Sequence, residues 1–98
     1  MFLSAYHFAG DPDALCAAYD RFTASFAGVE LDLHACVRHG AGITVYDACP
    51  TREIAEAFST SPEFDRARRA AGLPEPRIDR LGLVHAAIAG GRPVAVRA

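Results

Sequence analysis

The sequence predicts an α+β domain with the ferredoxin-like order β-α-β-β-α-β, in which two helices lie on one face of a four-stranded antiparallel sheet. Short apolar or alternating segments indicate the strands. Apolar residues at helical spacing, each run preceded by a cap-like residue, indicate the helices. The length of 98 residues is typical of one domain, so residues 1–98 are expected to form a single domain with residues 89–98 as a short C-terminal tail.

Composition and charge exclude several classes of protein. Hydrophobic residues make up 51% and charged residues 22%, which is typical of a globular chain and not of a disordered one. The net charge of −2 argues against nucleic-acid binding. There is no apolar run of the roughly 18–20 residues that a membrane span needs, and no basic stretch typical of a secretory signal. The 3 cysteines contain no C-x-x-C pair, so we expect reduced thiols, no metal site and a cytoplasmic location.

The first strand and helix have clear signals. Residues 2–9 are apolar and aromatic, which predicts a strand that Gly10 ends. Asp11 is a good N-cap and Pro12 a good first helical residue. Gly28 is predicted to end this helix. The apolar stripe of the helix consists of Leu15, Tyr19, Phe22 and Phe26.

A hairpin and a second helix follow. Residues 31–38 and 43–49 are rich in strand-forming residues and are separated by a glycine-containing turn, which predicts a hairpin. Thr51 is a plausible N-cap for the second helix. Residues 61–63 (Ser-Pro-Glu) repeat this signal, so the helix is expected to be broken or kinked there before it ends at Gly72. Its apolar stripe is expected to begin with Ile54, Ala57 and Phe58.

The register of the hairpin stays open at this point. If Val37 pairs with Ile43, Asp47 shares its face with other apolar residues. If the pairing shifts by one residue, Asp47 lies on the same face as His34 and Cys36 instead. The two registers therefore predict different surroundings for the same carboxylate.

Residues 78–88 are predicted to form the fourth strand, and Gly90 and Gly91 open the tail. Two helices can cover only one face of such a sheet. The other face would expose a mixture of aliphatic and aromatic side chains to water, which monomers rarely tolerate. We therefore expect a homodimer that stacks the two uncovered faces about a two-fold axis.

The run from Val45 to Glu53, followed by Phe58 and by Ser61-Pro62-Glu63-Phe64, resembles the dimeric α/β-barrel superfamily, and within it the antibiotic-biosynthesis-monooxygenase-like proteins. The likeness covers roughly residues 2–88. It implies a homodimeric barrel and a small cofactor-independent enzyme, a monooxygenase, cyclase or isomerase, acting on a hydrophobic metabolite. It also implies that Cys49 faces the cavity, together with its alternating neighbours Asp47, Val45 and Ile43.

Two departures from the family pattern matter. Many relatives carry Trp-Glu-Ser/Asp where this chain has Cys49, Pro50 and Thr51. The second helical region also has no histidine, so the resemblance argues against haem degradation. These differences favour the alternative function, a non-catalytic ligand-binding or structural barrel.

Three residues are candidate catalytic groups. Asp47 lies late in an apolar strand, where a buried charge is costly unless it is paired. It is predicted to act as a general base or to bind a polar ligand group; alternatively, it accepts hydrogen bonds from the start of the following helix. His85, in the apolar fourth strand, is predicted to transfer a proton and His34 to orient a ligand oxygen, although most lone strand histidines are core or interface residues.

The candidate ligand-binding residues lie on the first and third predicted strands. Tyr6 is expected to donate a hydrogen bond to a ligand oxygen, although it could equally be a core ring. The remaining lining residues are expected to be His7, Phe8, Val45 and Cys49. The sequence thus predicts a hydrophobic small molecule and a second copy of the chain as partners, with no cofactor, metal, nucleic acid or membrane.

Overall fold

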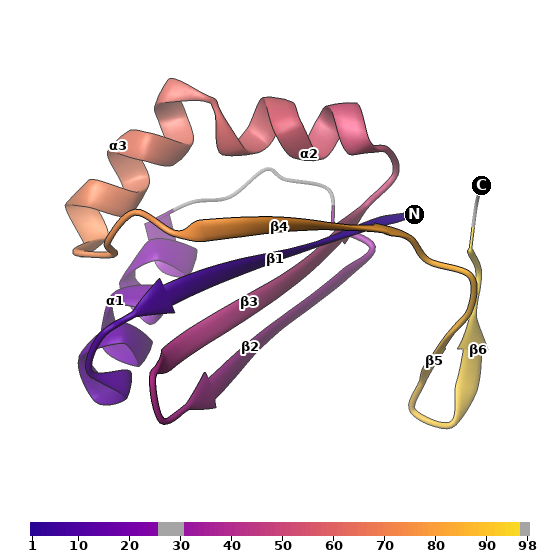
Figure 1. Ribbon diagram of the computed structural model, residues 1–98, viewed down its shortest axis with the longest axis horizontal. Helices are drawn as coiled ribbons and strands as arrows, with labels where there is room; N and C mark the ends of the chain where they lie inside the picture. The colour runs from indigo at the N-terminus through magenta and orange to yellow at the C-terminus, as the bar shows by residue number, and fades with distance from the viewer. Residues whose placement is uncertain (26–30, 97–98) are drawn as a thin grey trace.

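The computed structural model describes residues 1–25 and 31–96, which form an α+β domain of one four-stranded sheet, three helices and a small separate hairpin (Figure 1). Among these residues no helix is both long and apolar enough to cross a membrane. The elements in chain order are β1 (Phe2–Ala9), α1 (Pro12–Ser25), β2 (Leu33–His39), β3 (Gly42–Cys49), α2 (Arg52–Ser59), α3 (Pro62–Ala71), β4 (Arg77–Leu83), β5 (Ala87–Ala89) and β6 (Arg92–Val94).

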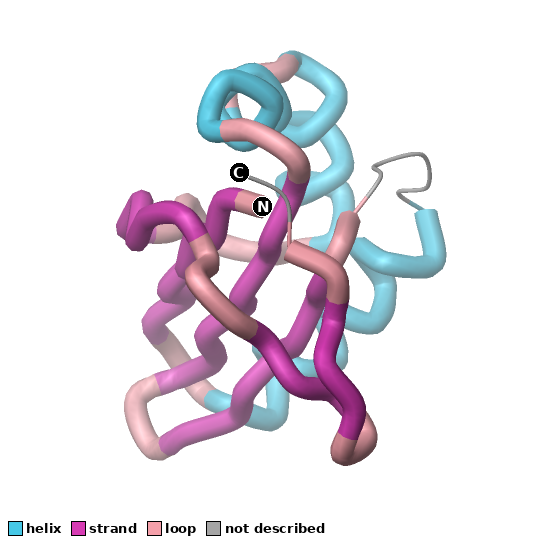
Figure 2. The backbone as a smooth tube through the Cα atoms, turned by 90° about the vertical axis from the view of Figure 1, so that its right-hand side faces the viewer, coloured by secondary structure: helices cyan, strands magenta, loops and turns pink. Residues whose placement is uncertain are grey.

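The main sheet has the strand order β2-β3-β1-β4, and all of its neighbouring strands are antiparallel. The helices lie on one side of this sheet (Figure 2). This arrangement is compatible with the ferredoxin-like fold that the sequence predicts. Alternation along the two central strands places Tyr6, Phe8, Ile43 and Val45 on the helix-facing side, where they form the core with Leu15, Ala18 and Leu73.

The predicted helix caps are confirmed. The Asp11 carboxylate accepts from the N–H of Ala14 at 2.9 Å at the start of α1. Thr51 and Ser61 cap α2 and α3 through their hydroxyl oxygens. Gly72 ends α3 with a left-handed φ of 85°, as a C-terminal glycine commonly does. Phe26 and Gly28, assigned from sequence to the end of the first helix, lie outside the described residues.

The predicted break in the second helix is confirmed, but part of its predicted apolar stripe is wrong. Ile54 is 44% exposed and Ala57 is exposed, whereas Ala55 is only 5% exposed. Helix α2 is short and packs its apolar side chains against the sheet through Ala55 and Phe58, while most of its residues are exposed. Helix α3 buries Phe64, which is 6% exposed and packs against Tyr6 of β1.

The hairpin adopts the shifted register. Val37 pairs with Thr44, which places His34 opposite Asp47 and Cys36 opposite Val45. The turn contains only two residues between β2 and β3. The Asp47 carboxylate therefore shares the helix-facing side of the sheet with His34.

The predicted fourth strand is too long. Strand β4 ends at Leu83, and the pairing with β1 stops where the Val84 N–H donates to the carbonyl of Met1 at 2.9 Å. The chain then leaves the sheet through a bend at His85. Strands β5 and β6 form a hairpin around Gly90 and Gly91, and this hairpin stands apart from the sheet (Figures 1 and 2). Part of the predicted tail is therefore a strand.

Candidate functional site

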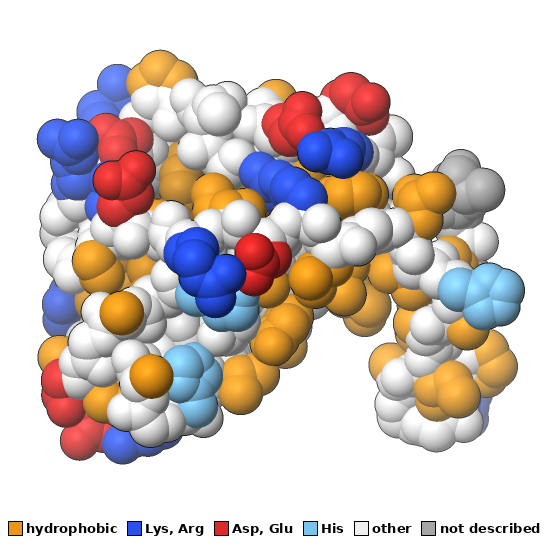
Figure 3. Space-filling view, viewed as in Figure 1, with side chains coloured by type: hydrophobic (Ala, Val, Ile, Leu, Met, Phe, Trp, Pro, Cys, Tyr) orange, Lys and Arg blue, Asp and Glu red, His pale blue; other side chains and the backbone are white. Residues whose placement is uncertain are grey.

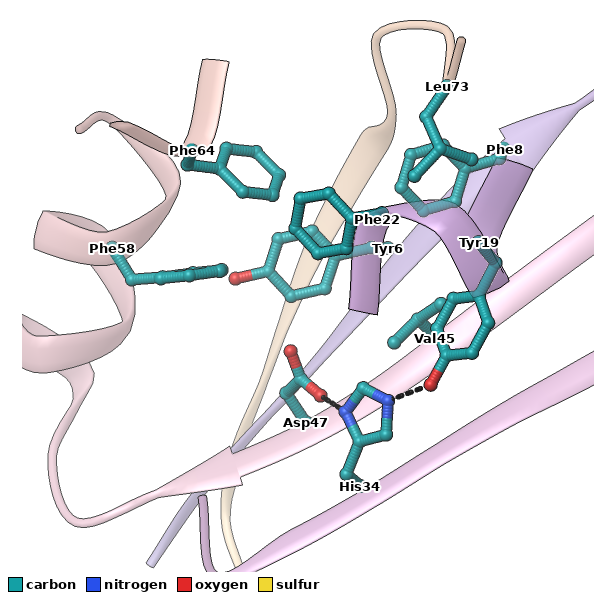
Figure 4. A pocket seen from close by; sticks show the side chains of 10 residues that line it. All are labelled: Tyr6, Phe8, Tyr19, Phe22, His34, Val45, Asp47, Phe58, Phe64 and Leu73. Atoms are coloured by element: carbon teal, nitrogen blue, oxygen red, sulfur yellow. Dashed lines mark hydrogen bonds and ion pairs between the residues drawn. The ribbon is translucent and has the colours of Figure 1, made fainter. Parts of the chain in front are cut away.

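A cavity lies between the helix-facing side of the sheet and the helices (Figure 4). Its volume is about 30 Å³. It is lined almost entirely by aromatic and aliphatic side chains, with a histidine and a carboxylate at one side: Tyr6, Phe8, Tyr19, Phe22, His34, Val45, Asp47, Phe58, Phe64 and Leu73. Such a lining, apolar with few polar groups, is typical of a small-molecule site.

Packed aromatic rings form the apolar wall. Phe64 of α3 is at the centre, with ring centroids 4.8 Å from Phe58, 5.8 Å from Phe22 and 6.2 Å from Tyr6. These are tilted or edge-on contacts, the geometry that aromatic pairs favour. Because one ring comes from each helix and one from β1, the wall depends on the packing of all three helices against the sheet.

A chain of hydrogen bonds forms the polar side of the cavity. His34 Nδ1 lies 2.5 Å from Asp47 Oδ1, and His34 Nε2 is hydrogen-bonded to the hydroxyl of Tyr19 (Figure 4). A carboxylate can only accept, so His34 donates its Nδ1 hydrogen to Asp47. In the neutral imidazole Nε2 is then the acceptor, and Tyr19 donates to it. The ring of Tyr19 also stacks on that of His34, with centroids 5.8 Å apart.

The surroundings change the proton affinity of two members of this chain, His34 and Tyr19. The hydrogen bond from Asp47 raises the pKa of His34 above its ordinary value, against a smaller opposing effect of burial. Burial raises the pKa of the Tyr19 hydroxyl. The Asp47 side chain is 13% exposed and that of His34 is 32% exposed, so the pair lies where the cavity meets the surface. An imidazole of raised pKa at this place is a candidate acid and base.

A smaller cavity of about 10 Å³ continues beyond Asp47 and shares Tyr6, Asp47 and Phe58 with the first. Cys49 lines it, in agreement with the predicted face. The thiol donates to the carbonyl of Thr51 at 3.2 Å, and burial raises its pKa. Cys49 is therefore a packed thiol in the wall rather than an activated nucleophile.

The structure brings together six of the eight residues that the sequence singles out. Asp47, His34, Tyr6, Phe8, Val45 and Cys49 all line these two cavities. Asp47 pairs with His34, and the start of α2 is capped by Thr51, so the interpretation of this carboxylate as a helix cap is wrong.

His7 and His85 lie elsewhere. His7 follows Tyr6 on β1 and so points to the open side of the sheet, where its ring bonds Thr44 Oγ1 at 3.0 Å and Asp79 Oδ2 at 2.9 Å. The prediction that it faces the cavity is wrong. His85 lies in the exposed bend after β4 and not in an apolar strand. Within residues 1–25 and 31–96 no three histidine, cysteine or carboxylate side chains are grouped to hold a metal.

Sequence reasoning missed two residues of the site. Tyr19 was assigned only to the apolar stripe of the first helix, although a tyrosine in such a stripe carries a hydroxyl that needs a partner. Arg80 was passed over in the fourth strand. It shares the helix-facing side with Ile78, and this alternation was the available signal.

Comparison of the chain with protein-family models, with curated proteins and with solved structures finds no match.

Proposed function

We propose that the protein is a small cofactor-independent enzyme that transfers a proton within a hydrophobic metabolite, as isomerases and cyclases do. The observation that carries the proposal is the Tyr19–His34–Asp47 hydrogen-bond chain at the edge of an aromatic cavity. A base must lie within hydrogen-bond reach of the proton it removes, and its pKa should be close to the working pH. Because both nitrogens of His34 are engaged, the Tyr19 hydroxyl is the group that can meet the first condition for a ligand in the cavity, and the raised pKa of His34 favours the second.

The three side chains have distinct roles in this proposal. Asp47 holds the imidazole in one tautomer and stabilises its protonated form. His34 Nε2 takes the proton. It does so through Tyr19, whose oxygen accepts the proton of the substrate while its own hydrogen passes to Nε2. The reverse transfer returns the proton to a different substrate atom, so the reaction needs no net oxidant or reductant.

The family resemblance supports the same class of substrate. The strand order is compatible with the fold of dimeric α/β-barrel proteins, and the cavity walls are apolar. Within that resemblance, we favour the isomerase or cyclase type over the monooxygenase type, because the side chains gathered here are suited to moving a proton.

The alternative is a non-catalytic barrel that binds a ligand or only associates with itself. The small volume of the cavity, about 30 Å³, favours it. Pockets that enclose drug-sized ligands measure roughly 300–1,000 Å³. A metabolite of that size would require α1 and α2 to move apart, whereas a structural barrel would keep its space filled by side chains.

Exchange of substrate hydrogen for deuterium in heavy water tests the proposal. A panel of hydrophobic ketones and phenols would be incubated with the protein and followed by mass spectrometry. We expect exchange with the wild type and a loss of about 10²–10⁴-fold in His34→Gln and in Asp47→Asn. His7→Gln is the matched control, because His7 also bonds an aspartate but lies on the opposite side of the sheet. Exchange that survives in both site variants would contradict the proposal.

We also propose that the chain forms a homodimer through the open side of the sheet. Large apolar side chains are exposed there and on the adjoining hairpin: Val37 at 45%, Tyr46 at 36%, Leu81 at 54% and Ile88 at 74%. Figure 3 shows hydrophobic side chains on both sides of the space between the sheet and the hairpin. An isolated two-stranded hairpin is only marginally stable in water, so β5 and β6 need a covering surface. A second copy would supply that surface and cover both open faces at once.

A further inference from the structure

Arg80 is the starting point, because no carboxylate in the described part of the chain forms an ion pair with it. It projects from the helix-facing side of β4 and is half-buried. Its guanidinium donates only to neutral oxygens: Ser4 Oγ at 2.9 Å, Tyr6 Oη at 3.3 Å, the Ala55 carbonyl at 3.3 Å and Ser59 Oγ at 2.5 Å. Among residues 1–25 and 31–96 no carboxylate lies within ion-pair distance of it. A guanidinium withdrawn from water usually pairs with an anion.

Two of the three hydroxyls that accept hydrogen bonds from the guanidinium belong to the smaller cavity. Ser4 is 1% exposed and Tyr6 is 3% exposed, and both line the smaller cavity. Each hydroxyl oxygen accepts a hydrogen from Arg80, so its own hydrogen remains available to donate elsewhere. Figure 4 shows the Tyr6 hydroxyl beside the ring of Phe58, at the end of the cavity away from Tyr19. A positive charge behind two aligned donors is the arrangement that binds a negatively charged oxygen.

We propose that the Tyr6 and Ser4 hydroxyls, with Arg80 behind them, form an oxyanion-binding subsite, and that the ligand is a hydrophobic compound carrying a carboxylate or enolate oxygen. The inference rests on the proposed function, since it places this oxygen in the smaller cavity, which shares Tyr6 and Asp47 with the cavity that His34 lines. Tyr6 and Ser4 touch the ligand oxygen, whereas Arg80 acts through them as a positioning residue. In the proton-transfer reaction, the electron pair left by the departing proton would accumulate on this oxygen.

The other charges at the cavity fit a ligand with one negative charge. The titratable groups that face His34 are Asp47 of β3 and Tyr19 of α1. When His34 is protonated it balances Asp47, and the charge of Arg80 is left over. When His34 is neutral, the negative charge of Asp47 offsets the positive charge of Arg80 instead, and a bound anion is attracted less strongly. Anion affinity should therefore fall as the pH rises through the raised pKa of His34.

Benzoate and benzamide are suitable probes, because they have nearly the same shape and differ in charge. Their dissociation constants would be measured by NMR titration with the wild type, Arg80→Met and Tyr6→Phe. Arg77→Met is the matched control, since Arg77 lies on the same strand but faces the other side of the sheet and pairs with Asp79. We expect the wild type and the control to bind benzoate about tenfold more tightly than benzamide, as one charge-assisted hydrogen bond would give.

The ratio of the two affinities decides the result, because a loss of fold alone would weaken both probes alike. In Arg80→Met and in Tyr6→Phe we expect the ratio to fall to about one while benzamide still binds. Tyr6→Phe keeps the ring and thereby preserves the core if Arg80→Met does not fold. Equal binding of the two probes to the wild type, or an unchanged ratio in both variants, would overturn the subsite only. Failure of the wild type to bind either probe would overturn the proposed function with it.

Discussion

At the scale of single residues, His34 gains its character from one neighbour. Its Nδ1 lies 2.5 Å from Asp47, and this hydrogen bond is the main reason why its pKa is raised. His7 has a comparable bond to Asp79 at 2.9 Å on the opposite side of the sheet, away from the cavity that His34 lines. A comparison of His34 with His7 therefore separates the effect of a carboxylate partner on an imidazole from the effect of the cavity.

Asp47→Asn should lower the pKa of His34 towards the ordinary value of about 6.5. The asparagine keeps the shape of the side chain but removes the charge that stabilises the imidazolium. The measurement is an NMR titration of the imidazole signals. Asp79→Asn is the control and should leave His34 unchanged. An unaltered His34 titration in Asp47→Asn would show that this hydrogen bond does not set its proton affinity.

The same bond predicts how stability depends on pH. A histidine whose pKa is higher in the folded state than in the unfolded state binds its proton more tightly when folded. Its contribution to stability is complete below the unfolded value of about 6.5 and is lost as the pH rises through the folded value. Urea unfolding of the wild type should therefore show this loss on the alkaline side of about 6.5. Asp47→Asn should show a flatter profile there, and parallel profiles would contradict the linkage.

At the scale of elements, the register of the β2–β3 hairpin creates the site. Pairing Val37 with Thr44 puts His34 across from Asp47, whereas the neighbouring register would put them on opposite faces. Gly42, the first residue of β3, follows this turn in a conformation that favours glycine. Gly42 has a φ of 147°, and a Cβ there would lie 2.0 Å from the carbonyl oxygen of Phe8 on β1.

Gly42→Ala should therefore destabilise the protein by about 2 kcal/mol or more, because it combines an unfavourable φ with a backbone collision. Gly40→Ala, in the same turn, is the control: an added Cβ meets nothing within 4 Å and its φ is not positive. Chemical denaturation of both variants measures the difference. Equal stability of the two would mean that the turn can relax without cost, and that Gly42 does not fix the register.

The sequence allowed the elements and their caps to be predicted, because these depend on local chemistry. Asp11, Thr51 and Ser61 all cap helices as expected. The register could not be predicted, since both alignments of the hairpin satisfy the alternation and contacts between elements, such as the close approach of Gly42 to Phe8 on β1, distinguish them. His85 was misplaced for a related reason: an apolar run continues past Leu83, but the neighbouring strand does not. Tyr19 and Arg80 reach the site through contacts between elements that lie far apart in the chain.

At the scale of the whole molecule, the uneven covering of the sheet is the dominant feature. Three helices protect one side, while the other side and the hairpin expose Val37, Leu81 and Ile88. Pairing of open faces between two copies would remove this surface from water and leave both cavities on the outer, helix-covered sides. In that arrangement each chain would keep a complete site, so assembly and catalysis could be altered separately.

Val37→Arg tests this arrangement directly. A charge within a buried apolar interface is costly when it has no partner, so we expect the wild type to be a dimer and the variant a monomer in light scattering at micromolar concentration. Ile54→Arg is the control, because Ile54 is 44% exposed, close to the 45% of Val37, but lies on the helical side. A monomeric wild type would contradict the homodimer. A dimeric Val37→Arg would mean that the dimer interface does not include this part of the open face of the sheet.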